Sequence, residues 1–482
     1  MTRTPFLRNT KAPFNPQHPA HKMNAPQIVA LIVLFGGLIA PLPVLACLVF
    51  ILPSFGAMAV VPPSLLLGTS LTPGSLAAFF FVLRALMRPE VFREALAALG
   101  DFRRLGWLAL FFVVAAIGAA LLPRLFAGEI QVYGMRTPWL GAVEPTVANF
   151  TQTGYLFLSL LTTAVFFALI RKESAFRETF LNAVLAGGVA VIATGLVYII
   201  ANATGQGDVL QAFHTADYGY SAGAILGQLR VLGLTPEPSV FGQLAVSFCA
   251  LLLFFRPVYP RKLWRWKIPV VGWGCAVMAF LSTSSTAYAS MFALLGLYLF
   301  YDAYALSKEG IVLRQTAGRK MTAAFAFVLI VLLAALLDSS VLTYSADMVD
   351  TLIFKKMETV SYIERSRWTL TGLNAFMESY GLGVGAGSVR TSNFFANILA
   401  STGLPGALLF FAFLARLYSR HAPQRDSRDE AMIKAAKLAL IPMFASLFLA
   451  GTTPDFGIVP GALFGMIAGL AQPMQKTRQG NS

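Results

Sequence analysis

The chain has 482 residues, of which 57% are hydrophobic and 12% are charged, and its mean hydropathy is +0.68. Soluble domains carry roughly one quarter charged residues, so this composition excludes a soluble globular protein and predicts an integral membrane protein. The net charge of +15 does not indicate a nucleic-acid partner, because the basic residues fall in alternate loops. The three cysteines lie in apolar runs, where buried hydrophobic side chains are expected rather than redox chemistry.

Apolar runs of about 17 to 25 residues recur along the chain, and each can cross a bilayer as a helix. We predict an all-α, polytopic fold with about 12 transmembrane helices. Prolines interrupt the pattern before residue 84, so about ten or fourteen helices would fit the same charge pattern. The predicted spans, in chain order, are 28–52, 60–84, 106–123, 154–171, 181–202, 240–256, 267–282, 285–304, 320–338, 394–415, 436–452 and 456–472.

Lysine and arginine gather in alternate connections, namely 1–26, 84–104, 171–177, 256–267, 308–320, 416–437 and the C-terminal end. This positive-inside pattern predicts that these loops and both termini are cytoplasmic. The domain organisation that follows is an N-terminal tail at 1–26, a single membrane domain at 27–472 and a short tail at 473–482. No small-residue cleavage site follows the tail, so we expect the first helix to be retained. The segment 416–437 is interpreted as a solvated connector.

The predicted topology leaves three large outer (periplasmic) loops, near 124–153, 203–239 and 339–393. Loops of this length are uncommon unless they have a function. The basic residues that depart from the alternation all lie in these loops: Arg124, Arg136, Arg230, Lys355, Lys356, Arg365, Arg367 and Arg390. The positive-inside rule does not explain a cation on the outer side, so we interpret these residues as candidates for binding an anion.

The second outer loop contains "RVLGLTPEPSVFG", in which Glu237 lies between two prolines at the start of a predicted helix. We expect Ser239 to cap that helix. The helix N-terminus favours a negative charge at Glu237, which suits either a partner for an arginine or simple compensation of the helix dipole. His214 is the one histidine predicted outside the cytoplasmic face, so it is the imidazole available there for proton transfer.

The last outer loop has helical apolar spacing between 359 and 381 and predicts a helix that lies along the outer surface. Arg365 and Arg367 are two positions apart and diverge by about 160° on such a helix; each can equally be an interfacial cation that extends toward water. The stretch "GLGVGAGSVRTSN" follows, and its glycines around Arg390 could cradle an anion or simply connect two helices. The bend "STSSTAYAS" at 282–290 is interpreted as helix packing. The carboxylates are too sparse to support a metal site.

Taken together, "RVLGLTPEPSVFG", "LSTSSTAYAS", "RSRWTLTGLNAFMESYGLGVGAGSVRTSN" and "ASTGLPGALLF" resemble the O-antigen ligase and polymerase superfamily, in particular the Wzy-type exopolysaccharide polymerases. The resemblance covers residues 30–470 in hydropathy, whereas motif-like identity is confined to these stretches. It implies a GT-C-like glycosyltransferase of the bacterial inner membrane that needs neither metal nor cofactor. Such an enzyme joins undecaprenyl-diphosphate-linked repeat units into exopolysaccharide or O-antigen at the outer face. Implied partners are a chain-length regulator and a flippase of the same pathway.

The resemblance also implies roles for individual residues. Arg230 and Arg367 are the first choices for contact with the diphosphate, followed by Arg365 and Arg390 as substrate-binding residues. Glu237 would orient an arginine or accept the proton of the attacking hydroxyl.

Ligases of the superfamily carry a histidine in the last large loop, but residues 339–393 contain none. Asn393 and its neighbours stand where that histidine would be sought, so the general base stays open. Two alternatives to a polymerase remain: a ligase that transfers finished glycan to a lipid or protein acceptor, and a transporter or flippase of lipid-linked saccharides. A flippase is expected to carry polar residues within its helices, whereas the arginines here lie in outer loops.

Overall fold

The computed structural model describes residues 23–66, 69–135, 137, 139–217, 230–259, 262–308, 360–423 and 427–471. Within these ranges the chain is predominantly α-helical, and its one sheet consists of two short antiparallel strands in which Val132 pairs with Gly141. The predicted span 320–338, together with Arg136, Lys355 and Lys356, lies outside the described residues.

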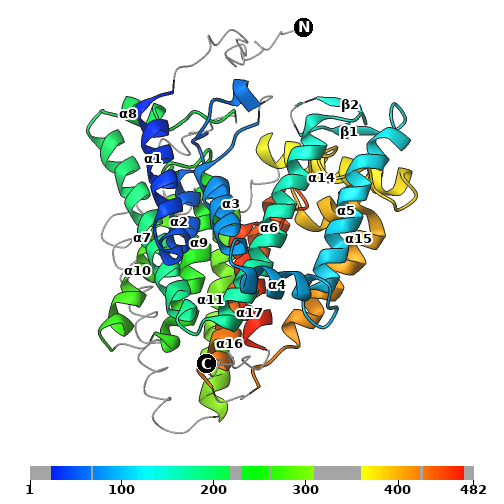
Figure 1. Ribbon diagram of the computed structural model, residues 1–482. Coiled ribbons are helices and arrows are strands. Elements are labelled where there is room, and N and C mark those ends of the chain that lie inside the picture. The colour runs from blue at the N-terminus through cyan, green and yellow to red at the C-terminus, as the bar shows by residue number, and fades with distance from the viewer. Residues whose placement is uncertain are drawn as a thin grey trace.

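Most of the described elements are helices that pack side by side in a bundle (Figure 1). They are α1 (Ala25–Ile39), α2 (Leu42–Ile51), η1 (Leu52–Phe55), η2 (Pro63–Leu66), α3 (Pro73–Leu86), α4 (Pro89–Leu99), α5 (Gly106–Leu125), β1 (Gln131–Tyr133), β2 (Leu140–Ala142), α6 (Val147–Lys172), α7 (Phe176–Ala203), α8 (Asp208–Gln211), α9 (Pro238–Phe255), η3 (Arg256–Val258), α10 (Lys262–Leu281), α11 (Ser285–Lys308), α14 (Val360–Glu378), α15 (Phe394–Tyr418), α16 (Arg428–Ala450) and α17 (Ile458–Leu470).

Six of the described helices, α5, α6, α7, α9, α15 and α16, are long and apolar enough to cross a membrane. Shorter apolar helices accompany them, among them α1, α2, α3 and α17. The chain is therefore an all-α, multi-pass membrane protein. The total of about 12 spans stays a prediction, because the structure divides the first predicted span into two helices and does not describe 320–338.

The two N-terminal helices form a hairpin instead of one span. Asn24 caps α1, and its side-chain amide donates to the carbonyl of Ala212, 2.7 Å away, at the end of α8. At the other end of α1, the Arg84 guanidinium donates to the carbonyl of Leu38. Pro41 and Pro43 lie at the start of α2, where the chain reverses. Proline is tolerated in the first turn of a helix but disrupts a helix interior, so these residues prevent α1 and α2 from forming one continuous helix. The start of α1 thus lies at the same end as the second outer loop. The end of α17 lies at the opposite end of the bundle (Figure 1). The tails predicted to share the cytoplasmic side, before residue 23 and after residue 471, lie outside the described residues.

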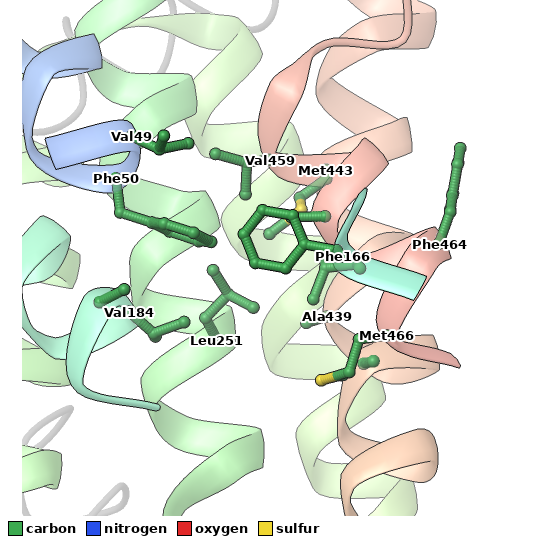
Figure 2. Packing of buried hydrophobic residues seen from close by; sticks show 14 of the residues in the cluster. Val49, Phe50, Phe166, Val184, Leu251, Ala439, Met443, Val459, Phe464 and Met466 are labelled. Atoms are coloured by element: carbon green, nitrogen blue, oxygen red, sulfur yellow. The ribbon is translucent and has the colours of Figure 1, made fainter. Parts of the chain in front are cut away.

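Aromatic packing fills the centre of the bundle. Phe166 of α6 contacts Phe50 of α2 with ring centroids 6.2 Å apart, and Phe50 also meets Phe180 and Phe248 edge to face. Figure 2 shows Phe166 between α2 on one side and the residues of α16 and α17 on the other. Close backbone approach adds to this packing, because a methyl group on Gly465 would lie 2.2 Å from the carbonyl oxygen of Thr163.

A small cap covers one end of the bundle, where α14 and the β1–β2 hairpin lie together (Figure 1). Its own apolar cluster comprises Phe126, Ile130, Val132, Val143, Ala375, Val384, Val389 and Ala400. The described parts of all three predicted outer loops reach this end, which we call the capped end.

The opposite end carries the arginine- and lysine-rich connections and is called the basic end. There the buried Glu94 of α4 lies 3.1 Å from a guanidinium nitrogen of Arg104 and 3.3 Å from one of Arg171. The segment 416–437 is not a plain connector, because α16 begins at Arg428 with Ser427 as its N-cap. Arg177 and Asp429 join α7 to that first turn through an ion pair of 2.6 Å.

Candidate functional site

The segment from Arg230 to Glu237 is fixed by backbone geometry before it enters α9. The amide of Val231 donates to the carbonyl of Leu281, 3.0 Å away, and Gly233 takes a φ of +55° that favours glycine. Thr235 closes the turn by donating its hydroxyl to the carbonyl of Leu232, 2.8 Å away. The segment is therefore held against the end of α10.

Glu237, not Ser239, is the N-cap of α9. Its backbone is extended, its carbonyl accepts from the amide of Val240 at 3.1 Å, and Pro238 occupies the first helical position. Proline suits that position because it lacks the amide that would go unpaired there. The Glu237 carboxylate makes no capping hydrogen bond to its own helix. It is consequently directed to other partners.

Arg230 is anchored on the bend between α10 and α11. Its Nε donates to the Thr283 hydroxyl and one terminal nitrogen donates to the Thr283 carbonyl, both at 3.1 Å. Thr283 has a φ of +45°, which is uncommon for a residue with a side chain. Burial lowers the pKa of Arg230, while the neighbouring Glu237 carboxylate opposes the shift and Arg365 adds to it. The hydroxyl-rich bend, interpreted from the sequence as packing alone, thus also positions a cation.

Arg365 reaches Glu237 from a distant part of the chain. One of its terminal nitrogens lies 3.6 Å from a Glu237 carboxylate oxygen, with the two side chains 28% and 39% exposed. Arg367 is exposed, and the regular helix α14 turns it about 160° away from Arg365. The outer side of α14 also exposes Leu370 and Met377, by 61% and 71% respectively. The structure therefore brings Arg365 to the cluster and leaves Arg367 on an apolar outer stripe.

Arg390 approaches from the end of the glycine-rich loop. Its guanidinium carbon lies 4.1 Å from the ring centroid of Trp368 on α14, a cation–π geometry, and its amide donates to the Tyr133 carbonyl of β1 at 2.7 Å. Burial lowers the pKa of Arg390, an effect that the Glu237 charge opposes. The Nε of Arg390 is buried and has no hydrogen-bond partner among the described residues. A donor is thus left over at this position.

The glycine-rich loop itself is a packing element. Residues 383–389 are buried, and Gly381, Gly383, Gly385 and Gly387 all have positive φ. A methyl group on Gly387 would lie 2.3 Å from the Ala148 carbonyl oxygen, and one on Gly385 would lie 2.9 Å from that of Gly118. Asn149 of α6 secures the loop by donating to the Ala386 carbonyl and the Ser388 hydroxyl, each 2.8 Å away. Of the two readings left open by the sequence, the connection between helices fits this geometry.

Asn393 and His214 have surroundings of their own. Asn393 is the N-cap of α15 and accepts from the amide of Ala396 at 3.0 Å. His214 lies in a segment that hydrogen-bonds to 57–59, where the Ala216 amide donates to the Ala57 carbonyl at 3.1 Å. Burial lowers the pKa of His214. Residue 57 also connects this segment to the residues before α9, because the Ala57 amide donates to the Leu234 carbonyl at 3.0 Å.

The geometry thus gathers three arginines around one carboxylate. We call Arg230, Glu237, Arg365 and Arg390 the arginine cluster; the Glu237 charge acts on all three cations. The net charge of the cluster is positive, and each planar guanidinium carries several N–H donors, so the cluster can bind an anion. Sequence reasoning missed Thr283 and Trp368, which hold two of these arginines. Two features of the sequence could have indicated them: the many hydroxyl side chains of 282–290 around Thr283, and the position of Trp368 one helical turn from Arg365.

Comparison with known proteins gives no family for this chain: no family model matches it, and neither does any curated protein.

Proposed function

We propose that the protein is a glycosyltransferase of the bacterial inner membrane that polymerises undecaprenyl-diphosphate-linked oligosaccharide repeat units at the outer face. The observation that supports this proposal is the arginine cluster, which stands at the capped end of an apolar bundle. With the basic end in the cytoplasm, as the positive-inside rule favours, the cluster faces the outer side. A lipid diphosphate lying in the outer leaflet would meet it there.

The main requirements of the reaction are binding of the diphosphate and stabilisation of the charge on the leaving group. A hydroxyl oxygen of the acceptor sugar forms a bond to the anomeric carbon of the donor glycan, and the bond from that carbon to the diphosphate oxygen breaks. The diphosphate leaves with the bonding electron pair, and the hydroxyl proton passes to a base. Arg230, Arg365 and Arg390 would stabilise the charge that develops on the leaving group. The leftover Nε donor of Arg390 suits such a contact.

Glu237 can take part in two ways. Its ion pair with Arg365 would orient that guanidinium toward the diphosphate. Its carboxylate, 39% exposed and free of the helix cap, can also accept the hydroxyl proton. Arg367 would contact the carrier from the outer stripe of α14, outside the cluster.

The direct test is incubation of the purified full-length protein with defined undecaprenyl-diphosphate-linked repeat units. The polymerase proposal expects a ladder of products that differ by one repeat, together with released undecaprenyl diphosphate. Substitution of both Arg365 and Arg390 by alanine should remove the ladder while the protein still folds and inserts. A transfer product formed only with a separate lipid or protein acceptor would favour the ligase. Movement of intact repeat units across vesicles without release of carrier would favour the transporter, and either result would overturn the polymerase.

A further inference from the structure

A second cationic site lies at the basic end of the bundle, far along α15 from the arginine cluster. A cavity of about 190 Å³ is lined by Arg103, Arg416, Ser419, Arg420, His421 and Ala471. This volume is smaller than the roughly 300–1,000 Å³ of pockets for drug-sized ligands. Three of its six lining residues are arginines and none is acidic. We call it the basic pocket.

Arg420 forms the fixed part of the pocket. One of its terminal nitrogens donates to the carbonyl of Arg103, 3.0 Å away, and also to that of Arg104. The other terminal nitrogen is buried and has no hydrogen-bond partner in the described ranges. Burial, with a smaller contribution from the neighbouring Arg416, lowers the pKa of Arg420 to about 10, against the opposing effect of Asp101. One buried donor is therefore left without an acceptor.

The cations of this pocket repel one another. Arg416 lies in the last turn of α15 and Arg420 just beyond its C-cap, and the positive charge of Arg416 disfavours that of Arg420. Two carboxylates near the pocket have partners of their own. Asp101 pairs with Arg104 at 3.1 Å, and Glu430 contacts the pocket residue His421 at 2.9 Å and accepts from the Ala422 amide at 2.7 Å. An anion in the pocket would accept a hydrogen bond from the unpaired terminal nitrogen of Arg420 and would also reduce the repulsion between the arginines.

We propose that the basic pocket binds a phosphate-bearing anion. The three guanidinium groups match a tetrahedral oxyanion by charge and donor number. The Ser419 hydroxyl also lines the pocket, but it donates to the Arg416 carbonyl at 2.8 Å. The phosphate group can belong to the headgroup of an anionic phospholipid in the adjoining leaflet or to free phosphate in solution. This proposal does not depend on the glycosyltransferase proposal.

The test uses the full-length protein in a neutral detergent with two probes, inorganic phosphate and phosphatidylglycerol. Phosphate should raise the thermal midpoint above that in chloride of equal ionic strength, or phosphatidylglycerol should be retained over phosphatidylcholine in native mass spectra. The double variant Arg103→Gln/Arg416→Gln removes two exposed cations and leaves the structural contacts of Arg420 in place. It should weaken the apparent affinity about tenfold or more, as expected from two lost charge-assisted contacts.

Arg93→Gln is the matched control, since Arg93 is an exposed arginine of α4 at the same end but outside the pocket. It should bind within about twofold of the wild type, a ratio far below the tenfold step of 1.4 kcal/mol. Stabilisation by phosphate with no lipid preference would identify free phosphate, and selective lipid retention that phosphate competes away would identify a headgroup. Equal binding of the wild type and the double variant, or an equal loss in Arg93→Gln, would overturn the proposal.

Discussion

Glu237→Gln separates the two roles available to the central carboxylate of the arginine cluster. The substitution keeps the shape of the side chain and removes its charge. A pair 3.6 Å apart is worth roughly 1 kcal/mol in water and roughly 5 kcal/mol at an effective dielectric of 20. Both side chains are partly exposed, so the net contribution to folding should be about 1 kcal/mol or less. The thermal midpoint should therefore change little.

Catalysis should respond in two opposite directions. At about 7 Å, a carboxylate repels each unit of diphosphate charge by roughly 0.6 to 2.4 kcal/mol, so Glu237→Gln should lower KM for the lipid-linked donor by about tenfold. If Glu237 accepts the hydroxyl proton, kcat should fall by about 10²- to 10⁴-fold. The assay is steady-state release of undecaprenyl diphosphate by the purified variant.

Glu364→Gln is the matched control for this variant. Glu364 is an exposed carboxylate on α14 whose charge also acts on Arg390, but Arg365 pairs with Glu237 instead. It should lower KM slightly and leave kcat unchanged. A raised KM with an unchanged kcat in Glu237→Gln would refute both the expected repulsion of the diphosphate and the proton-accepting role, and it would leave only the role of orienting Arg365.

Three further predictions follow from the geometry. Arg365→Ala should reduce transfer by about 10²-fold, whereas Arg367→Ala, on the outer stripe of the same helix, should stay within a few-fold; equal losses would argue against the inward position of Arg365. Gly387→Ala should cost more stability than Gly128→Ala in thermal unfolding. Both have positive φ, but a methyl group meets the backbone only at Gly387. For His214, whose pKa is lowered on folding, the unfolded chain binds more protons below about pH 6.5. Stability should fall as the pH drops through that range, and His214→Gln should flatten the difference between midpoints at pH 7.5 and 5.5.

The long helices could be predicted from the sequence because their apolar runs dictate them. The predicted span 106–123 corresponds to α5 and 181–202 to α7, with ends that differ by a few residues. The N-terminal hairpin was missed, since hydropathy counts 28–52 as one run and does not report direction. Tertiary contacts reveal the reversal, such as those of Asn24 with Ala212 and of Gln27 with the Ala59 carbonyl.

The sequence could predict which residues belong to the candidate site better than it could predict how they are oriented. The sequence selects Arg230, Arg365 and Arg390 because they depart from the alternation of basic loops, and the positive-inside rule gives no reason for a cation in an outer loop. It selects Arg367 equally, since charge patterning carries no information on which face of a helix turns inward. The N-cap was placed two residues late because Ser239 has the usual capping side chain, whereas Pro238 fixes the first helical position and moves the cap to Glu237.

The arginine cluster depends on the packing beneath it. Arg390 is held at the end of the buried glycine-rich loop, and that loop is fixed to α5 and α6 by close backbone contacts at Gly385 and Gly387. The Arg390 amide is tied to β1, and its guanidinium rests on Trp368 of the same helix that carries Arg365. Interiors pack too densely to absorb an added methyl group without a shift. A substitution in the glycine-rich loop would therefore move two of the three cations relative to Glu237 without touching any of them.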